Sequence, residues 1–203
     1  DCSSRGLGDV YKRQVLLADL TDLDQVEAIG RELNDQGEAI DGLLLNAGLQ
    51  YAGHRQVRRS AQGVELTIAV NHLAHQRLLM DLLPLLHQSA APRVVITASE
   101  VHNPASGGGR VGRPADLGDL SGLEQRSEMV NGEPPFDADK AYKDSKLCNL
   151  LMGRHLARLQ PQWPVICWSP GLVIPRSRDG FFRNSREANP IGQALFGFVA
   201  RDL

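Results

Sequence analysis

The chain has 203 residues, which is long enough for one domain with a substantial buried core. Hydrophobic residues make up 42% of it and charged residues 23%, as in ordinary globular proteins. The formal net charge is only −2, so the composition argues against nucleic acid or an anionic membrane surface as a partner. The longest apolar runs are too short to span a bilayer, and we expect no integral membrane segment.

The cysteines and histidines indicate neither a disulfide framework nor a metal site. Cys2, Cys148 and Cys167 show no CxxC spacing, and so few cysteines suit a reducing compartment. The start of the chain also lacks the apolar stretch of a secretory signal, so we expect a cytoplasmic protein. His72 and His75 form an HxxH pair, but no third ligand is spaced to complete a metal site, and no metal is expected.

The first elements that the sequence predicts are a strand, a helix and a second strand. Residues 15–20 (VLLADL) form a short apolar run of strand length. Asp22 can cap the helix that follows, and Gly37 is placed to end it. Residues 42–45 form the second buried strand, which leads directly into an Asn-Ala-Gly sequence.

The second half of the chain continues this alternation around one long irregular segment. Apolar residues at helical spacing predict a helix over residues 61–86, and residues 93–98 are β-branched and predict a third strand. Residues 100–135 contain several glycines and prolines, and a loop of that length usually has a functional reason. A further helix is predicted over residues 138–159 and a fourth strand over residues 164–168.

Strands that are apolar throughout and alternate with amphipathic helices predict βαβ units and a parallel sheet. We therefore expect an α/β fold with a Rossmann-type, doubly wound parallel sheet and right-handed crossovers. Ligands of such sheets bind at the carboxyl ends of the strands. The residues expected at these ends are Asp19, Asn46, Ser99 and Pro170.

Tyr142 and Lys146 lie four residues apart on a predicted helix, and therefore on one face of it. A phenol has a pKa of ~10 and is a poor acid–base catalyst at neutral pH. A nearby ammonium favours the phenolate, so we expect Lys146 to lower the pKa of Tyr142 and to make proton exchange with a carbonyl or alkoxide feasible. Taken alone, the YxxxK spacing also occurs on ordinary exposed helices.

Two more polar residues can complete a catalytic set with Tyr142 and Lys146. Ser99 lies at the end of a predicted strand, where its hydroxyl could hold a substrate oxygen beside the phenol. Asn71 lies within the long predicted helix before that strand, where its amide could relay protons through water.

Three strand ends have residues that suit contact with a cofactor. Asn46, Ala47 and Gly48 follow a strand directly, and the small residues allow the backbone to approach a cofactor closely. Residues 19–20 (Asp-Leu) end another strand, where they could contact an adenine ring. Residues 170–171 (Pro-Gly) follow the last predicted strand, where backbone groups could meet a nicotinamide carboxamide.

In this order, these features resemble the short-chain dehydrogenase/reductase family over residues 15–173. The resemblance implies a catalytic tetrad of Asn71, Ser99, Tyr142 and Lys146, in which Tyr142 donates a proton and Lys146 also holds the nicotinamide ribose. It implies NADPH (or NADP+) as the cofactor and a small-molecule substrate. The cofactor contacts that it implies are Asp19, Leu20, Asn46, Ala47, Gly48, Tyr142, Lys146, Pro170, Gly171 and Val173.

A narrower resemblance lies in and after the long irregular segment. Residues 115–123 (ADLGDLSGL) and 136–149 (FDADKAYKDSKLCN) are similar to the light-dependent protochlorophyllide reductases, and so are residues 181–183 (FFR). The segment between Ser99 and Tyr142 is also much longer than in most members of the superfamily. This branch implies hydride transfer to a double bond of a tetrapyrrole, a part in chlorophyll biosynthesis, and peripheral attachment to photosynthetic membranes. A homo-oligomer is also compatible with the resemblance.

Two positions favour a different substrate. Leu172 stands where that branch has a cysteine, and Pro175 stands where a threonine is usual. Both departures favour a retinol-dehydrogenase-like carbonyl or alcohol reductase. A third alternative is a non-catalytic relative that binds nucleotide or pigment, and an intact tetrad argues against it.

The family's first two strands, its Gly-rich cofactor turn and its last strand are not found in the sequence. Residues 1–14 show no apolar periodicity, and we expect them to be a non-native leader. Residues 15–203 would then be a partial dinucleotide-binding domain. We expect such a fragment to be inactive by itself, and the strand at residues 15–20 to lack its native neighbour.

Overall fold

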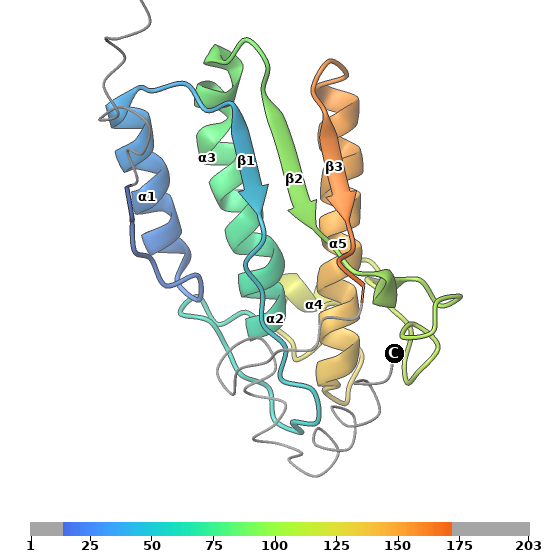
Figure 1. Cartoon of the computed structure of the whole chain (residues 1–203). Helices are drawn as coiled ribbons and strands as arrows, with labels where there is room; N and C mark the ends of the chain where they lie inside the picture. The colour runs from blue at the N-terminus through green and yellow to red at the C-terminus, as the bar shows by residue number, and fades with distance from the viewer. Residues whose placement is uncertain (1–13, 172–203) are drawn as a thin grey trace, which may run out of the picture.

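Residues 14–171 are described by the computed structural model, and they form an open α/β layer structure. The strands are β1 (Gly42–Leu45), β2 (Arg93–Thr97) and β3 (Val165–Trp168). The principal helices are α1 (Leu23–Gln36), α3 (Ala74–Gln88) and α5 (Ala138–Leu159). The strands are parallel in the order β1-β2-β3, α3 and α5 cover one face of the sheet, and α1 packs beside α3 (Figure 1). The predicted α/β class and parallel sheet are therefore confirmed.

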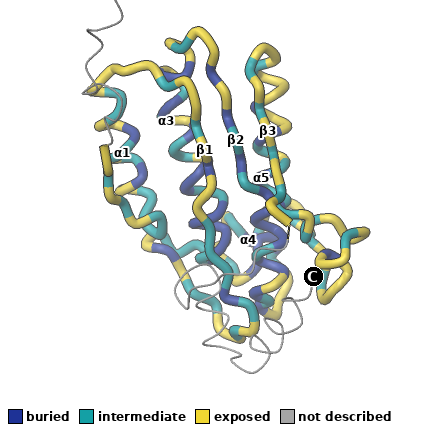
Figure 2. Tube along the Cα trace, in the orientation of Figure 1, coloured by how far each residue is buried: buried dark blue, intermediate teal, exposed yellow. Residues whose placement is uncertain are grey.

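The register of the sheet separates a helix-facing side from an open side. Leu45, Ile96 and Cys167 are paired across the strands and belong to the core beneath α3 and α5. Leu44 and Ile166 flank β2 on the opposite face and are exposed. Figure 2 accordingly shows β2 as the most buried strand. The second helical layer of a doubly wound sheet is not found among the described residues.

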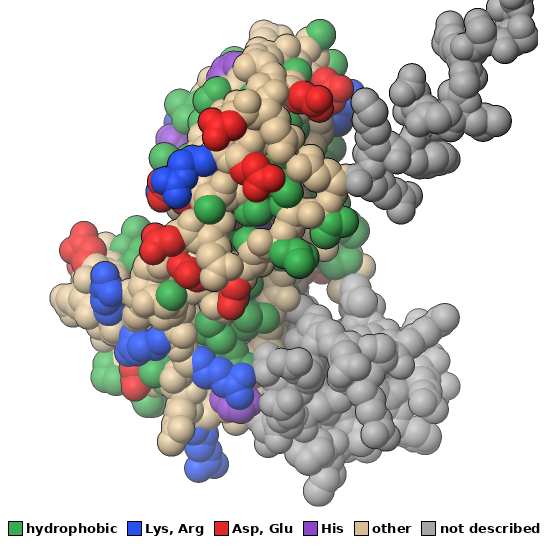
Figure 3. All heavy atoms as spheres, turned by 90° about the vertical axis from the view of Figure 1, so that its left-hand side faces the viewer, with side chains coloured by type: hydrophobic (Ala, Val, Ile, Leu, Met, Phe, Trp, Pro, Cys, Tyr) green, Lys and Arg blue, Asp and Glu red, His purple; other side chains and the backbone are tan. Residues whose placement is uncertain are grey.

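Local sequence signals set the ends of α1 as predicted. The carboxylate of Asp22 accepts a hydrogen bond from the backbone N–H of Asp24 at 3.1 Å, and Gly37 ends the helix with φ 68°. The face of the molecule turned to the viewer in Figure 3 bears both acidic and basic side chains. Glu27 of α1 is ion-paired with Arg31 and with Arg77 of α3, as is usual for a solvated helix surface.

The strand predicted at residues 15–20 is wrong, because residues 14–19 carry no regular structure. Within the described part of the chain no strand lies beside this segment to supply backbone partners, since β1 pairs with β2. Val15 and Leu17 remain exposed. The segment instead ends in a turn that leads into α1.

The long helix predicted over residues 61–86 begins later than predicted. Its first turn is α2 (Leu66–Ile68), followed by a π-helical turn η1 (Ala69–Leu73) and then by α3. The carboxylate of Glu65 caps α2 by accepting from the N–H groups of Thr67 and Ile68, both at 2.9 Å. Buried Tyr51 donates its hydroxyl to the same carboxylate, which is a non-local contact that fixes the start of the helix.

The irregular segment before α5 contains little regular structure, as predicted. It holds a short 3-10 helix η2 (Glu100–His102) and a single helical turn α4 (Ser121–Glu124). The predicted helix at residues 138–159 matches α5 at both ends. Asp137 sets the first of these ends by capping the first turn. The two remaining strands each differ from prediction by one residue at one end.

Candidate active site

Three members of the predicted tetrad meet at the carboxyl end of β2. Tyr142 and Lys146 lie on one face of α5, with Lys146 Nζ 5.5 Å from the centroid of the Tyr142 ring. Ser99 lies two residues after the end of β2, and its side chain hydrogen-bonds the Tyr142 phenol. The structure thus brings Ser99, Tyr142 and Lys146 together as the sequence predicts.

Lys146 is held by the end of β2. Its ammonium donates to the backbone carbonyl of Thr97 at 3.1 Å, and its side chain is buried. Burial penalises the charged form and lowers the pKa of Lys146 to about 8. The ammonium is therefore present at neutral pH and is lost at moderately basic pH.

The pKa of Tyr142 differs from the sequence-based expectation. Burial raises it to about 12, and the hydrogen bond from the Ser99 side chain only partly offsets that rise. The predicted lowering by Lys146 is therefore wrong for this structure, because burial raises the pKa of the phenol and the contribution that opposes the rise comes from Ser99. The phenol keeps its proton at neutral pH, which suits a proton donor better than a base.

Asn71 is the fourth predicted member, and it lies in the π-helical turn η1. Its Oδ1 accepts from the N–H of Leu49 at 2.7 Å, and its Nδ2 donates to the Leu49 carbonyl at 3.0 Å and to Ser145 Oγ at 3.1 Å. The side chain is fully buried and ties the loop after β1 to α5. These contacts give Asn71 a positioning role, while the proton relay stays a prediction. Such π-helical turns are frequent at functional sites.

The loop after β1 offers an open backbone beside Lys146. A Cβ added to Gly48 would lie 3.4 Å from Asn71 Oδ1 and 3.8 Å from Lys146 Nζ. Asn46 and Ala47 are exposed, and Asn46 Oδ1 accepts a hydrogen bond from the Thr97 hydroxyl at 2.9 Å. Contact of this loop with a cofactor stays a prediction.

The remaining predicted cofactor contacts are less closely joined to the tetrad. Pro170 and Gly171 are exposed at the end of β3, and Gly171 has φ 73°. Asp19 and Leu20 form the turn before α1, in which Asp19 Oδ1 accepts from the N–H of Thr21 at 2.9 Å. The backbone N–H of Asp19 donates to the side-chain oxygen of Gln25 in α1 at 3.0 Å, so this turn is held by the start of that helix. Val173 lies outside the described residues.

A second hydrogen-bonded chain behind Lys146 was not predicted from the sequence. Asn149 Nδ2 donates to the Thr97 carbonyl at 3.3 Å, and Asn149 Oδ1 lies 3.1 Å from His72 Nδ1. Since an amide oxygen can only accept, His72 must carry its proton on Nδ1. The three-residue spacing of Lys146 and Asn149 on α5 is the signal that could have indicated this pair.

A buried histidine, His75, and a half-buried one, His72, lie near the tetrad but do not form a metal site. Burial lowers the pKa of His72, and it lowers the pKa of His75 to about 4, helped by the charge of Lys146. Both rings therefore stay neutral at physiological pH. Across the described residues, no group of three His, Cys, Asp or Glu side chains could hold a metal ion.

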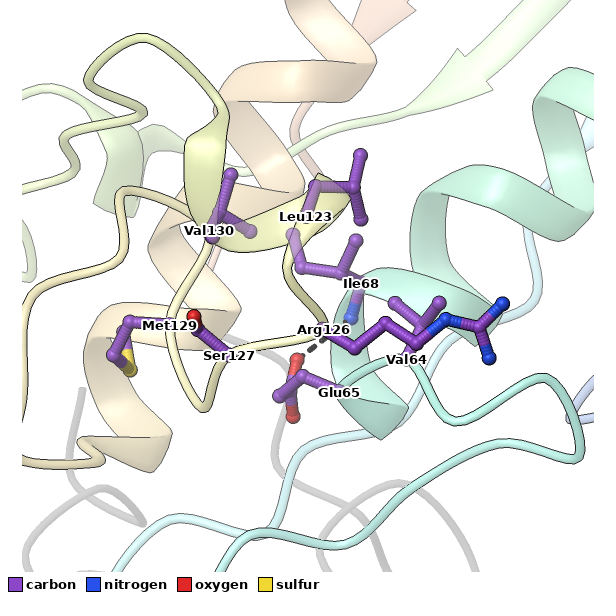
Figure 4. A pocket seen from close by; sticks show the side chains of 9 residues that line it. Val64, Glu65, Ile68, Leu123, Arg126, Ser127, Met129 and Val130 are labelled. Carbon is purple, nitrogen blue, oxygen red and sulfur yellow. Dashed lines mark hydrogen bonds between the residues drawn. The ribbon is translucent and has the colours of Figure 1, made fainter.

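A small pocket lies apart from the tetrad, between the start of α2 and the irregular segment (Figure 4). Ile68, Leu123 and Met129 line it, and the Glu65 carboxylate accepts from the N–H of Ile68 at its edge. No tetrad residue contributes to the lining. We interpret it as a gap in the packing between the irregular segment and the helical turns that lead to Asn71.

Comparison with known proteins gives protochlorophyllide reductases among its relatives. The profile of the short chain dehydrogenase family matches residues 9–109. The protochlorophyllide reductase of Avena sativa is 35% identical over 90% of this chain and 60% of its own length. Protochlorophyllide reductase A, chloroplastic, of Oryza sativa is 37% identical over 90% of this chain and 48% of its own length. The chain thus spans about half to three fifths of the length of these relatives.

Two solved structures from bacteria have a similar fold. A short chain dehydrogenase of Escherichia coli in complex with NADPH superposes with a TM-score of 0.56 at 24% identity, over 89% of this chain and 61% of that one. A Mycobacterium paratuberculosis protein superposes with a TM-score of 0.57 at 27% identity, over 92% of this chain and 58% of that one. The first of these supports the fold alone.

Proposed function

Because this chain belongs to the short-chain dehydrogenase/reductase family, we propose that the full-length protein is an NADPH-dependent reductase of a tetrapyrrole double bond, resembling the protochlorophyllide reductases. The observation that carries the proposal is the half-buried Tyr142 phenol, which hydrogen-bonds the Ser99 side chain and lies beside the Lys146 ammonium. This is a proton donor, an orienting hydroxyl and a fixed cation at the carboxyl end of a parallel sheet, where such folds bind their ligands.

The residues around Lys146 suit a nicotinamide cofactor. When bound, NADPH would supply the hydride. The Thr97 carbonyl takes one of the three N–H donors of Lys146, and the other two can hold ribose hydroxyls. Gly48 keeps the adjacent space free of a side chain, and Asn46 and Ala47 present open backbone at the end of β1.

Tyr142 would supply the proton. With a pKa of about 12, its hydroxyl remains protonated across the physiological range. Ser99 holds that hydroxyl in place, and the positive charge of Lys146 stabilises the phenolate left after the proton has moved.

The choice of a tetrapyrrole rests on the sequence matches, which extend through residues 115–123 and 136–149 and cover 90% of the chain. The test is an assay of the full-length protein with NADPH and protochlorophyllide, in darkness and under illumination. We expect light-dependent loss of protochlorophyllide and stoichiometric oxidation of NADPH. Absence of turnover in both conditions would sink the proposed substrate.

A carbonyl or alcohol reductase remains a second candidate, because Leu172 and Pro175 depart from the protochlorophyllide-reductase pattern. The same preparation can be assayed with retinal and NADPH in darkness. Turnover of retinal without turnover of protochlorophyllide would favour this alternative and leave the roles of Tyr142 and Lys146 unchanged.

The location of the protein and its assembly into a homo-oligomer stay predictions. The relatives from rice and cucumber carry the description chloroplastic. Among the described residues, no helix has both the length and the apolar character needed to cross a bilayer. We propose peripheral attachment to photosynthetic membranes, which co-sedimentation of the full-length protein with such membranes would test.

A further inference from the structure

Every lysine within residues 14–171 lies on α5 and is buried. Lys140, Lys143 and Lys146 have relative exposures of 2%, 4% and 2%. Each donates to at least one backbone carbonyl. Lys146 binds the end of β2, and the other two lysines bind the segment between β2 and α5. Lys146 is explained by the proposed chemistry, whereas Lys143 is not.

Lys143 is enclosed by three carbonyl oxygens. Its ammonium donates to Gly109 at 3.2 Å, to Val111 at 2.5 Å and to Arg113 at 2.9 Å. These bonds use all three N–H donors of the side chain. Removing an ammonium from water costs several kcal/mol, so a buried lysine is poorly suited to stability alone. The effect of the Lys143 ammonium is to hold residues 109–113 in one conformation.

The loop that Lys143 holds begins at the active site. Residues 100–113 follow Ser99 directly, and Ser99 is bound to Tyr142, which precedes Lys143 on α5. The loop is therefore attached at its two ends to two consecutive residues of one helix. In Figure 1 it lies at the carboxyl end of β2 and β3, beside α5.

The loop between these attachments is internally ordered. The Ser106 hydroxyl donates to the carbonyl of Glu100 at 2.8 Å and accepts from the N–H of Gly109 at 3.0 Å. A Cβ at Gly109 would lie 1.8 Å from the carbonyl oxygen of Asn103, so only glycine fits there. Such a loop can be displaced as a unit when its distal attachment is removed.

A separate attachment holds the rest of the irregular segment. Lys140 donates to the carbonyl of Asp116 at 2.7 Å and to Asp144 at 2.6 Å, while Asp144 accepts from the N–H of Asp116 at 2.8 Å. This second anchor is independent of Lys143. A variant of Lys143 should consequently retain the packing of residues 116–131 and remain folded.

We propose that Lys143 is a specificity-determining positioning residue, whose ammonium fixes residues 109–113 so that the 100–113 loop forms the substrate-side wall of the active site. The identity of the substrate rests on the proposed function, but the attachment of the loop does not. Lys143 acts through the loop and does not itself take part in proton transfer.

The test uses Lys143→Met in the full-length protein, which keeps the aliphatic stem and removes the three donors. The control is Arg158→Met, which removes one exposed positive charge from the same helix. Without any ligand, the hydrogen-bonded amides of Ser106, Gly109 and Arg110 should exchange about tenfold faster or more in Lys143→Met. The amide of Gly118, which donates to Asp116, should be unchanged in both variants.

With the substrate that the assays identify, Lys143→Met should raise the KM for substrate by about tenfold, with the KM for NADPH within about twofold. Unchanged exchange at Gly109 and Arg110 would overturn the proposal, and so would an equal rise in both KM values. If neither protochlorophyllide nor retinal is turned over, the proposed function fails, and the exchange measurement still decides whether Lys143 holds the loop.

Discussion

At the scale of single residues, burial shifts the pKa values of two side chains on α5 in opposite directions. It raises the pKa of Tyr142 to about 12 and lowers the pKa of Lys146 to about 8. At neutral pH the phenol therefore has a proton to give, and the ammonium carries the charge that a ribose and a developing phenolate require.

The first prediction concerns the proton donor. Tyr142→Phe removes the hydroxyl and keeps the ring that lies against Lys146. We expect turnover to fall by about 10²–10⁴, the range for a positioned acid, because only the transferable proton is lost. The Kd for NADPH, measured by fluorescence titration, should change little. Near-normal turnover would remove Tyr142 from the mechanism.

The second prediction concerns the pH dependence of cofactor affinity. The pKa of Lys146 is lowered from 10.5 to about 8, so its ammonium is lost as pH rises through that value. We expect the Kd for NADPH to rise above about pH 8, because the neutral amine binds ribose hydroxyls less strongly. Titrations across this range should show the same dependence in Tyr142→Phe and none in Lys146→Met. A pH dependence that persists in Lys146→Met would assign it to another group.

At the scale of the elements, the sequence predicts best where local signals decide. Asp22, Gly37 and Asp137 set helix ends through their own caps, and these ends are correct. The start of α2 depends on Glu65, which is fixed by the distant Tyr51, and local periodicity could not reveal that contact. A strand at residues 15–20 needs a neighbour, so an apolar pattern alone is insufficient.

The candidate site shows the same division. A parallel sheet brings its strand ends together, so Asn46, Ser99, Tyr142 and Lys146 could be grouped from the sequence. The direction in which the pKa of Tyr142 shifts could not be predicted from the sequence, because it depends on how far the folded chain buries the phenol. The three-carbonyl enclosure of Lys143 likewise depends on the fold of a loop without regular structure.

The third prediction concerns the packing of α4. Gly122 is buried, and a Cβ there would lie 1.9 Å from the carbonyl oxygen of Met129 and 2.5 Å from the backbone nitrogen of Gly132. Backbone atoms cannot move aside as a side chain can, so Gly122→Ala should lower the free energy of unfolding by about 1–3 kcal/mol. The matched control is Gly107→Ala, where nothing lies within 4 Å of the new Cβ. Urea unfolding of both variants in the full-length protein checks this, and equal stabilities would contradict it.

At the scale of the whole molecule, the described residues form a sheet with helices on one face only. The chain spans 60% of the oat relative and 48% of the rice relative, and the expectation that it is inactive by itself stays a prediction. The register across the strands places Leu44 and Ile166 on the open face, in one row with Val95. An exposed row of β-branched and aliphatic side chains is a template for self-association.

The last prediction follows from that row. Leu44 and Ile166 are 61% and 50% exposed, so the 203-residue chain should self-associate through the open face of its sheet. The double variant Leu44→Thr/Ile166→Thr places β-branched residues at both strand positions but removes apolar surface, and it should shift the chain toward the monomer. Leu159→Thr is the control, because Leu159 is also 61% exposed but lies at the end of α5, away from the sheet face. Size-exclusion chromatography with light scattering should show a smaller mean mass for the double variant and no change for Leu159→Thr. An equal effect of both would mean that general surface hydrophobicity, rather than the open face of the sheet, drives the association.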